Sequence, residues 1–82
     1  MNELQSKNGL STEIADQLCL WIRKEQKPPG TVLGTEALLA KQFGVSRTVI
    51  REAIGQLRGL GIVSSRQGLG LCVASRDAID TI

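Results

Sequence analysis

The sequence predicts a small, mainly α-helical domain that ends in a short β-hairpin. Two observations carry this prediction. Apolar residues recur every three to four positions through most of the first 60 residues, which is the period of amphipathic helices. Two β-prone runs then flank a glycine-containing connection near the C-terminus, which is typical of a hairpin. A chain of 82 residues is long enough for one such domain and too short for two.

The first helix is expected from about residue 11 to residue 26. An apolar stripe with a spacing of four marks its buried side: Leu10, Ile14, Leu18 and Ile22. Ser11 or Thr12 can cap its start, and the Pro28-Pro29 pair ends it. Residues 1–10 lack this periodicity, so we predict a flexible N-terminal tail there.

Two further helices follow, joined by a tight turn. Thr35 is the expected N-cap of the second helix, which ends at Phe43-Gly44, where Gly44 can adopt the left-handed conformation. Ser46 is the expected cap of the third helix, which runs to about Leu60. At about 100° per residue, this third helix has an apolar arc made of Val49, Ile50, Ala53, Ile54, Leu57 and Leu60. Its opposite side carries Arg47, Thr48, Arg51, Glu52, Gly55 and Arg58.

The C-terminal part of the chain is expected to form a wing. Residues 62–66 and 71–74 have the composition of strands, and residues 31–33 of a minor strand. The order helix, short strand, helix, turn, helix, hairpin is that of a winged helix-turn-helix with three helices plus a wing. We therefore predict this fold over residues 11–74, followed by a linker at residues 75–82.

Charge is divided unevenly along the chain. Residues 1–39 have a balance of −1, whereas residues 40–76 carry six basic residues against one acidic residue, a balance of +5. A cationic segment of this kind suits a nucleic acid partner. On charge alone, a solvated basic face with no partner is an equal alternative.

Other classes of protein have little support in the sequence. The chain has no histidine, which excludes a zinc site of four Cys and His ligands, and we interpret Cys19 and Cys72 as small buried apolar residues. No pairing of carboxylates, or of a nucleophile with a base, indicates an enzyme. No apolar run approaches the roughly 18 residues of a membrane span, and no export signal opens the chain. We therefore expect a cytoplasmic protein that is neither an enzyme nor bound to a membrane.

The start of the third helix is suited to binding an anion. Two hydroxyls and two guanidinium groups accompany its free backbone N–H groups: Ser46, Arg47, Thr48 and Arg51. In a helix-turn-helix this end of the recognition helix lies at the major groove of duplex DNA. Arginine can bond guanine O6 and N7 together, and hydroxyls can donate to phosphates.

An ordered series of short motifs extends over residues 11–74. It comprises Pro29-Gly30, Thr35-Glu36, Leu39-Ala40, Phe43-Gly44-Val45-Ser46-Arg47-Thr48, Arg51-Glu52-Ala53, Leu57, Leu60-Gly61-Ile62-Val63, Arg66, Gly68, Gly70 and Val73. In order and spacing these motifs resemble the N-terminal DNA-binding domain of the GntR family, with its FadR-like subgroup most similar. The resemblance implies a bacterial, metabolite-responsive transcription regulator, usually a repressor. It further implies binding to palindromic operator DNA as a homodimer, with a separate C-terminal effector and dimerisation domain.

The resemblance also assigns the DNA contacts. These are Thr35, Ser46, Arg47, Thr48, Arg51, Arg66, Gln67 and Gly68. The recognition helix, at about residues 46–60, is expected in the major groove, and the wing at residues 62–74 is expected at the minor groove or phosphates. Glu36 is expected to stabilise the start of its helix and to orient an arginine. Arg58 is expected to be either a phosphate contact or a bystander.

One departure from the family pattern bears on specificity. Ala37 stands where family members often carry an arginine that contacts DNA, so the operator can differ from the usual family site. We expect no cofactor in this chain and a small-molecule effector on the absent C-terminal domain. The chain alone is expected to be monomeric or weakly associating.

The alternative function is a protein–protein or RNA-binding module built on the same winged-helix fold. Sequence-specific readers of RNA commonly stack bases on aromatic side chains. The two aromatic residues here, Trp21 and Phe43, fall at expected core positions, which favours duplex DNA over RNA.

Overall fold

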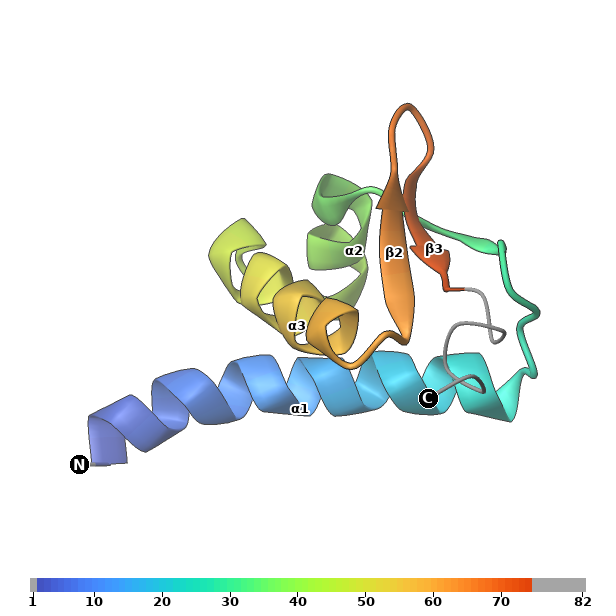
Figure 1. Ribbon diagram of the computed structural model, residues 1–82. Helices are drawn as coiled ribbons and strands as arrows, with labels where there is room; N and C mark the ends of the chain where they lie inside the picture. The colour runs from blue at the N-terminus through green and yellow to red at the C-terminus, as the bar shows by residue number, and fades with distance from the viewer. Residues whose placement is uncertain (1, 75–82) are drawn as a thin grey trace.

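The computed structural model describes residues 2–74, with side chains described from Gly9 onward, and it contains three helices and three strands. In chain order they are α1 (Asn2–Lys24), β1 (Val32–Gly34), α2 (Glu36–Phe43), α3 (Arg47–Gly59), β2 (Val63–Arg66) and β3 (Gly70–Val73). Figure 1 shows α1 beneath the other elements, α2 and α3 above it, and the β2–β3 hairpin standing up as a wing. This architecture confirms the predicted fold class. The predicted linker at 75–82 lies outside the described residues.

The first helix is longer than predicted. It begins at Asn2, so the prediction of a tail without regular structure at residues 1–10 is wrong from Asn2 onward. Ser11 is consequently not an N-cap but an interior residue, 1% exposed, whose hydroxyl donates to Glu52 Oε1 on α3 at 2.5 Å. Residues 2–10 contain no proline, and adding turns to an already formed helix costs much less than nucleating one. The first turns of α1 extend past α3 (Figure 1).

A single aliphatic core lies where α1, α2, α3 and the sheet meet. Its fully buried hydrophobic side chains include Leu18, Leu39, Ile50, Ile54 and Val63. The apolar arc predicted for α3 is confirmed except at Leu60, which is 69% exposed. Leu60 follows the last residue of α3, and the chain turns away there toward β2. Trp21 and Phe43 are only partly buried and pack against the core.

Both α2 and α3 begin with the predicted N-caps. The Thr35 hydroxyl accepts a hydrogen bond from the Leu38 amide at 3.1 Å, and the Ser46 hydroxyl accepts one from the Val49 amide at 3.2 Å. Gly44, with φ 69° and ψ 35°, has the left-handed conformation that ends α2. Gly44 and Ser46 therefore set the direction in which α3 leaves α2.

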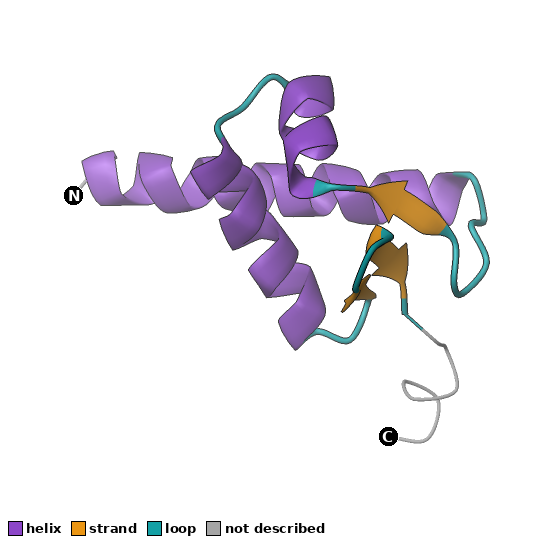
Figure 2. Ribbon diagram, turned by 90° about the horizontal axis from the view of Figure 1, so that it is seen from above, coloured by secondary structure: helices purple, strands orange, loops and turns teal. Residues whose placement is uncertain are grey.

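The wing belongs to a three-stranded antiparallel sheet with the order β1-β3-β2. The minor strand predicted at residues 31–33 forms as β1, and it pairs with β3 so that Val32 lies opposite Cys72. This pairing places β3 in the centre and leaves β2 at the edge. Figure 2 shows α3 crossing α1 and the strands gathered near the C-terminal half of α1.

Replacing Gly55 by alanine is expected to raise the free energy of unfolding by about 0.5–1 kcal/mol, because glycine inside a helix costs backbone entropy. Gly55 lies inside α3, and a Cβ built there meets no atom within 4 Å. Urea unfolding measures the gain, with Gly59→Ala at the last position of α3 as a control that should gain less. A loss of stability in Gly55→Ala would contradict the open space seen around this position.

Candidate nucleic-acid interface

The first turn of α3 presents its polar side chains to solvent. Arg47 and Thr48 are exposed, and Ser46 precedes them as the cap. Ile50 is fully buried one turn later and anchors this end of the helix in the core. The hydroxyl of Ser46 accepts the Val49 amide with its oxygen, so its own hydrogen stays available for a phosphate. The helix start is therefore rigidly placed and open to an anion.

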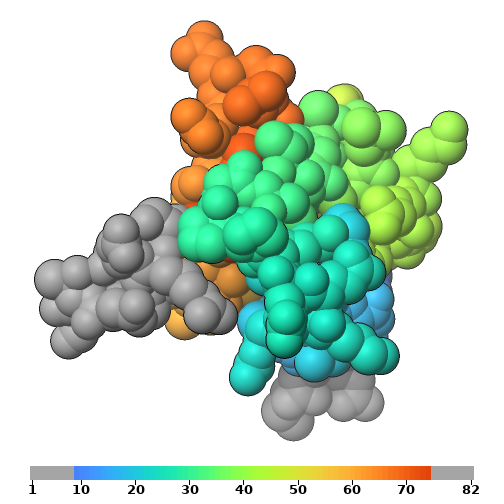
Figure 3. All heavy atoms as spheres, turned by 90° about the vertical axis from the view of Figure 1, so that its right-hand side faces the viewer, coloured from blue at the N-terminus to red at the C-terminus, as the bar shows by residue number. Residues whose placement is uncertain are grey.

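An open groove of about 680 Å³ joins the start of α2, the polar side of α3 and the wing. Four of the predicted DNA contacts line it: Thr35, Arg47, Arg66 and Gln67. Arg58, Ser65 and Ala37 line it as well. In Figure 3 the wing projects from the body of the domain beside the residues that lead into α2. Three separate elements thus contribute polar side chains to one concave surface.

An ion pair connects α2 and α3 beside this groove. Arg51 Nη2 lies 3.5 Å from Glu36 Oε1, with 68% and 40% of the respective side chains exposed. An exposed pair of this kind contributes only about 0–1 kcal/mol to stability. Glu36 therefore orients an arginine, as predicted, and a phosphate or guanine could compete for the same guanidinium at little energetic cost.

Arg58 makes a contact that the sequence did not reveal. Its Nη2 donates to the hydroxyl of Ser65 on β2, which links the last turn of α3 to the wing. Neither of the two predicted roles, phosphate contact or bystander, includes this bond. Ser65 lies beside α3 because β2 packs against the end of that helix, and no local pattern in the sequence encodes this packing.

Acidic groups near the basic residues of α3 are already engaged. Glu36 faces Arg51, and the carboxylate of Glu52 accepts the hydroxyl of Ser11. Arg47, Arg58 and Arg66 line the groove with Glu36 as its one acidic residue among those described. The groove consequently has the positive balance that suits a polyanion.

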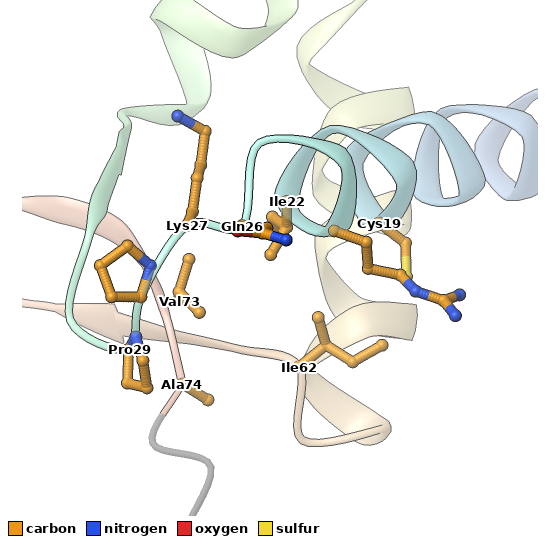
Figure 4. Close-up of a pocket in the computed structure, with 10 residues that line it drawn as sticks. Cys19, Ile22, Gln26, Lys27, Pro29, Ile62, Val73 and Ala74 are labelled. Carbon is orange, nitrogen blue, oxygen red and sulfur yellow. The ribbon is translucent and has the colours of Figure 1, made fainter.

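A second hollow lies at the C-terminal end of α1, away from the predicted contacts. Its volume is about 830 Å³, and Figure 4 shows side chains of α1, the following loop and the sheet around it, among them Ile22, Pro29, Ile62 and Val73. None of the predicted DNA-binding residues lines it. Cys19 lines it and is only partly buried, whereas Cys72 is buried as predicted.

Within residues 2–74 no helix is both long and apolar enough to cross a membrane. The same residues contain no group of three or more Cys, Asp or Glu side chains arranged to hold a metal ion.

Comparison with known families gives a direct result. Residues 10–73 match the family described as bacterial regulatory proteins, gntR family. The chain belongs to this family. The matched range covers α3, the wing and all but the first turns of α1, so the GntR assignment rests on the whole fold rather than on one motif.

Curated GntR relatives agree with this assignment. The chain is 41% identical over 68 residues to the uncharacterized HTH-type transcriptional regulator YieP of Escherichia coli K12, covering 83% of this chain. It is 41% identical over 64 residues to the mannosyl-D-glycerate transport/metabolism system repressor MngR of the same strain, covering 78% of this chain. These matches span 30% and 27% of the respective relatives, so the chain corresponds to under a third of their length.

Solved structures extend the comparison to DNA complexes. The DNA-binding domain of AraR in complex with operator ORX1 matches with a TM-score of 0.73 and 38% identity, over 79% of this chain and 78% of that one. The possible transcriptional regulator YydK from Bacillus subtilis matches with a TM-score of 0.75 and 26% identity, over 80% of this chain and 29% of that one.

These comparisons confirm the GntR family and the winged-helix fold, and the matched proteins are transcription regulators rather than enzymes. The assignment to the FadR-like subgroup and the individual DNA contacts stay predictions.

Proposed function

We propose that this chain is the sequence-specific, double-stranded DNA-binding domain of a bacterial transcription regulator. In this proposal α3 enters the major groove, and the wing lies at the adjacent minor groove or phosphates. The observation that carries the proposal is the groove that unites Arg47 on α3, Thr35 at the cap of α2, and Gln67 on the wing. Support comes from the AraR domain, a neighbour of similar fold whose structure contains operator DNA.

The predicted contacts divide into three groups. Arg47 and Arg51 are the candidates for reading bases, because a guanidinium can donate to guanine O6 and N7 together. Thr35, Ser46 and Thr48 carry hydroxyls at helix starts, and hydroxyls there position the protein on phosphates without reading sequence. Arg66, Gln67 and Gly68 form the exposed end of the wing and would follow the backbone or the minor groove.

The RNA-binding alternative has weaker support. Trp21 and Phe43 are the only aromatic residues in the chain, and both pack against the core. Stacking platforms for unpaired bases need exposed aromatic faces, and the groove beside α3 has none among its lining residues. Apart from the Glu36 carboxylate, the polar side chains that line the groove carry guanidinium, hydroxyl and amide groups, which suit phosphates and paired base edges.

The rest of the regulatory system is part of the same proposal. The relatives are more than three times as long as the matched segment, which leaves room for an effector and dimerisation domain in the intact protein. We propose a small-molecule effector there, a homodimer on a palindromic operator, and repression in the bacterial cytoplasm. One of the relatives, MngR, is a repressor, which supports repression rather than activation.

Replacing Arg47 by alanine is expected to reduce discrimination between operator and scrambled duplex by about 5- to 150-fold, the equivalent of one bidentate base contact. The test is a gel shift with duplex DNA from upstream of the gene, a scrambled duplex and single-stranded RNA. Arg23→Ala, at an exposed arginine in the last turn of α1, removes the same charge away from the groove and should keep discrimination.

Two outcomes would overturn the proposal. Preferential binding to the RNA would favour the alternative module. Equal discrimination by wild type and Arg47→Ala would exclude Arg47 as a base reader, and the same result with Arg51→Ala would remove α3 from base reading. Affinity for the duplex should also fall steeply with rising salt as counterions are released from DNA. Salt-independent binding would contradict a phosphate-contacting groove.

A further inference from the structure

We propose that Arg58 is a positioning residue for the wing. Its guanidinium holds the outer half of β2 against the last turn of α3 and so sets the wing at a defined angle to the recognition helix. The proposal rests on the DNA-binding function given above and assigns Arg58 a role beyond that function. The contact that supports it is the hydrogen bond from Arg58 Nη2 to the hydroxyl of Ser65.

The base of the wing is held by backbone bonds and by the core. The Ile62 amide donates to the Leu57 carbonyl at 3.0 Å, and the Ala74 amide donates to the Ile62 carbonyl at 2.9 Å. Val63 and Val73, the first pair of the hairpin, are both buried. Beyond this pair the outer strand becomes progressively exposed, and Ser65, Arg66 and Gln67 all face solvent.

The two strands of the wing differ in the number of strands that pair with them. Central β3 pairs with β1 on one side and with β2 on the other. Edge strand β2 has no strand on its outer side, and Ser65 lies only two residues before Gln67 at the exposed end. Among the described side chains, the Arg58–Ser65 bond is the one hydrogen bond that joins α3 to β2. Its loss would leave β2 beyond Val63 held only by its pairing with β3, which in turn pairs with β1.

Two substitutions distinguish a hydrogen bond between Arg58 and Ser65 from a contact between Arg58 and a DNA phosphate. Ser65 is neutral, so Ser65→Ala removes the acceptor and leaves the charge of the groove unchanged. Arg58→Ala removes both the bond and a positive charge. A positioning role predicts that the two variants behave alike, whereas a phosphate contact predicts that only Arg58→Ala has an effect.

The first measurement needs no DNA. Backbone ¹⁵N relaxation of residues 66–69 reports order at the end of the wing on the picosecond-to-nanosecond timescale. Order parameters there should fall in both Arg58→Ala and Ser65→Ala and stay unchanged in the control Arg23→Ala. Unchanged order in both variants would overturn the positioning role, whether or not the protein binds DNA.

The second measurement uses the duplex that wild type selects over the scrambled one. Both single variants should bind it about three- to tenfold more weakly, because the loosened wing must be ordered on binding. The double variant should be no weaker than Arg58→Ala, since the two changes remove one interaction. Hydroxyl-radical footprints should keep the protection due to α3 and lose that of the wing.

The salt dependence decides between the two roles. Loss of one phosphate contact reduces the magnitude of the negative slope of log affinity against log salt by about 0.9. The proposal would be overturned if Ser65→Ala bound the duplex with wild-type affinity while Arg58→Ala showed the shallower salt dependence. Arg58 would then be a phosphate contact. Failure of wild type itself to prefer the duplex would count against the DNA-binding function, and the relaxation data would still decide the role of Arg58.

Discussion

Shortening Leu18 to alanine is expected to lower the free energy of unfolding by about 2–5 kcal/mol, the range for a leucine truncated in a closed core. Leu18 is 0% exposed and lies in α1, within the cluster that includes Ile50 and Ile54 of α3. A domain of this size has a total stability of roughly 5–10 kcal/mol. The substitution therefore removes a large part of the stability and part of the α1 surface on which α3 packs.

Leu20 supplies a matched control for this prediction. It is the same residue type two positions along α1, and it is 59% exposed. Leu20→Ala should change the free energy of unfolding by no more than about 0.5 kcal/mol. Urea unfolding of both variants at 25 °C provides the comparison. Equal losses would mean that α1 presents a different face to the core.

Local patterns were sufficient to predict the parts of the molecule that depend on neighbouring residues. The spacing of four in α1 selected Leu18 and left out Leu20, as the core confirms, but it also selected Leu10, which is 41% exposed. The caps at Thr35 and Ser46 were predictable because a capping hydroxyl bonds an amide only three residues away. The polar side of α3 was predictable for the same reason, since a helix has a fixed period.

Features that depend on long-range register were not predictable. The bonds from Ser11 to Glu52 and from Arg58 to Ser65 join residues whose proximity depends on tertiary packing. Leu60 fits the apolar period of α3, but the helix ends one residue earlier and the period no longer applies there. The pairing of β1 with β3 was missed because a strand of three residues has little signal of its own.

The close approach between the wing and the start of α2 leads to the second large effect. Replacing Gly70 by alanine is expected to lower the free energy of unfolding by about 2–4 kcal/mol, from backbone strain together with overpacking. Gly70 has φ +98°, and a Cβ built there lies 2.6 Å from the Gly34 carbonyl oxygen and 3.2 Å from the Thr35 amide nitrogen. Both neighbours are backbone atoms, so β3 has to move away from the N-cap of α2.

Gly68→Ala separates the two causes of this effect. Gly68 has φ +83°, and a Cβ built there meets no atom within 4 Å, so only the strain of about 1 kcal/mol remains. Urea unfolding should therefore show a clearly larger loss for Gly70→Ala, and equal losses would contradict the close approach. Because Gly70 also lines the groove shared by α3 and the wing, its displacement should weaken duplex binding even at temperatures where the variant is folded. If folded Gly70→Ala bound the duplex with wild-type affinity, the position of the wing relative to α2 would not matter for binding.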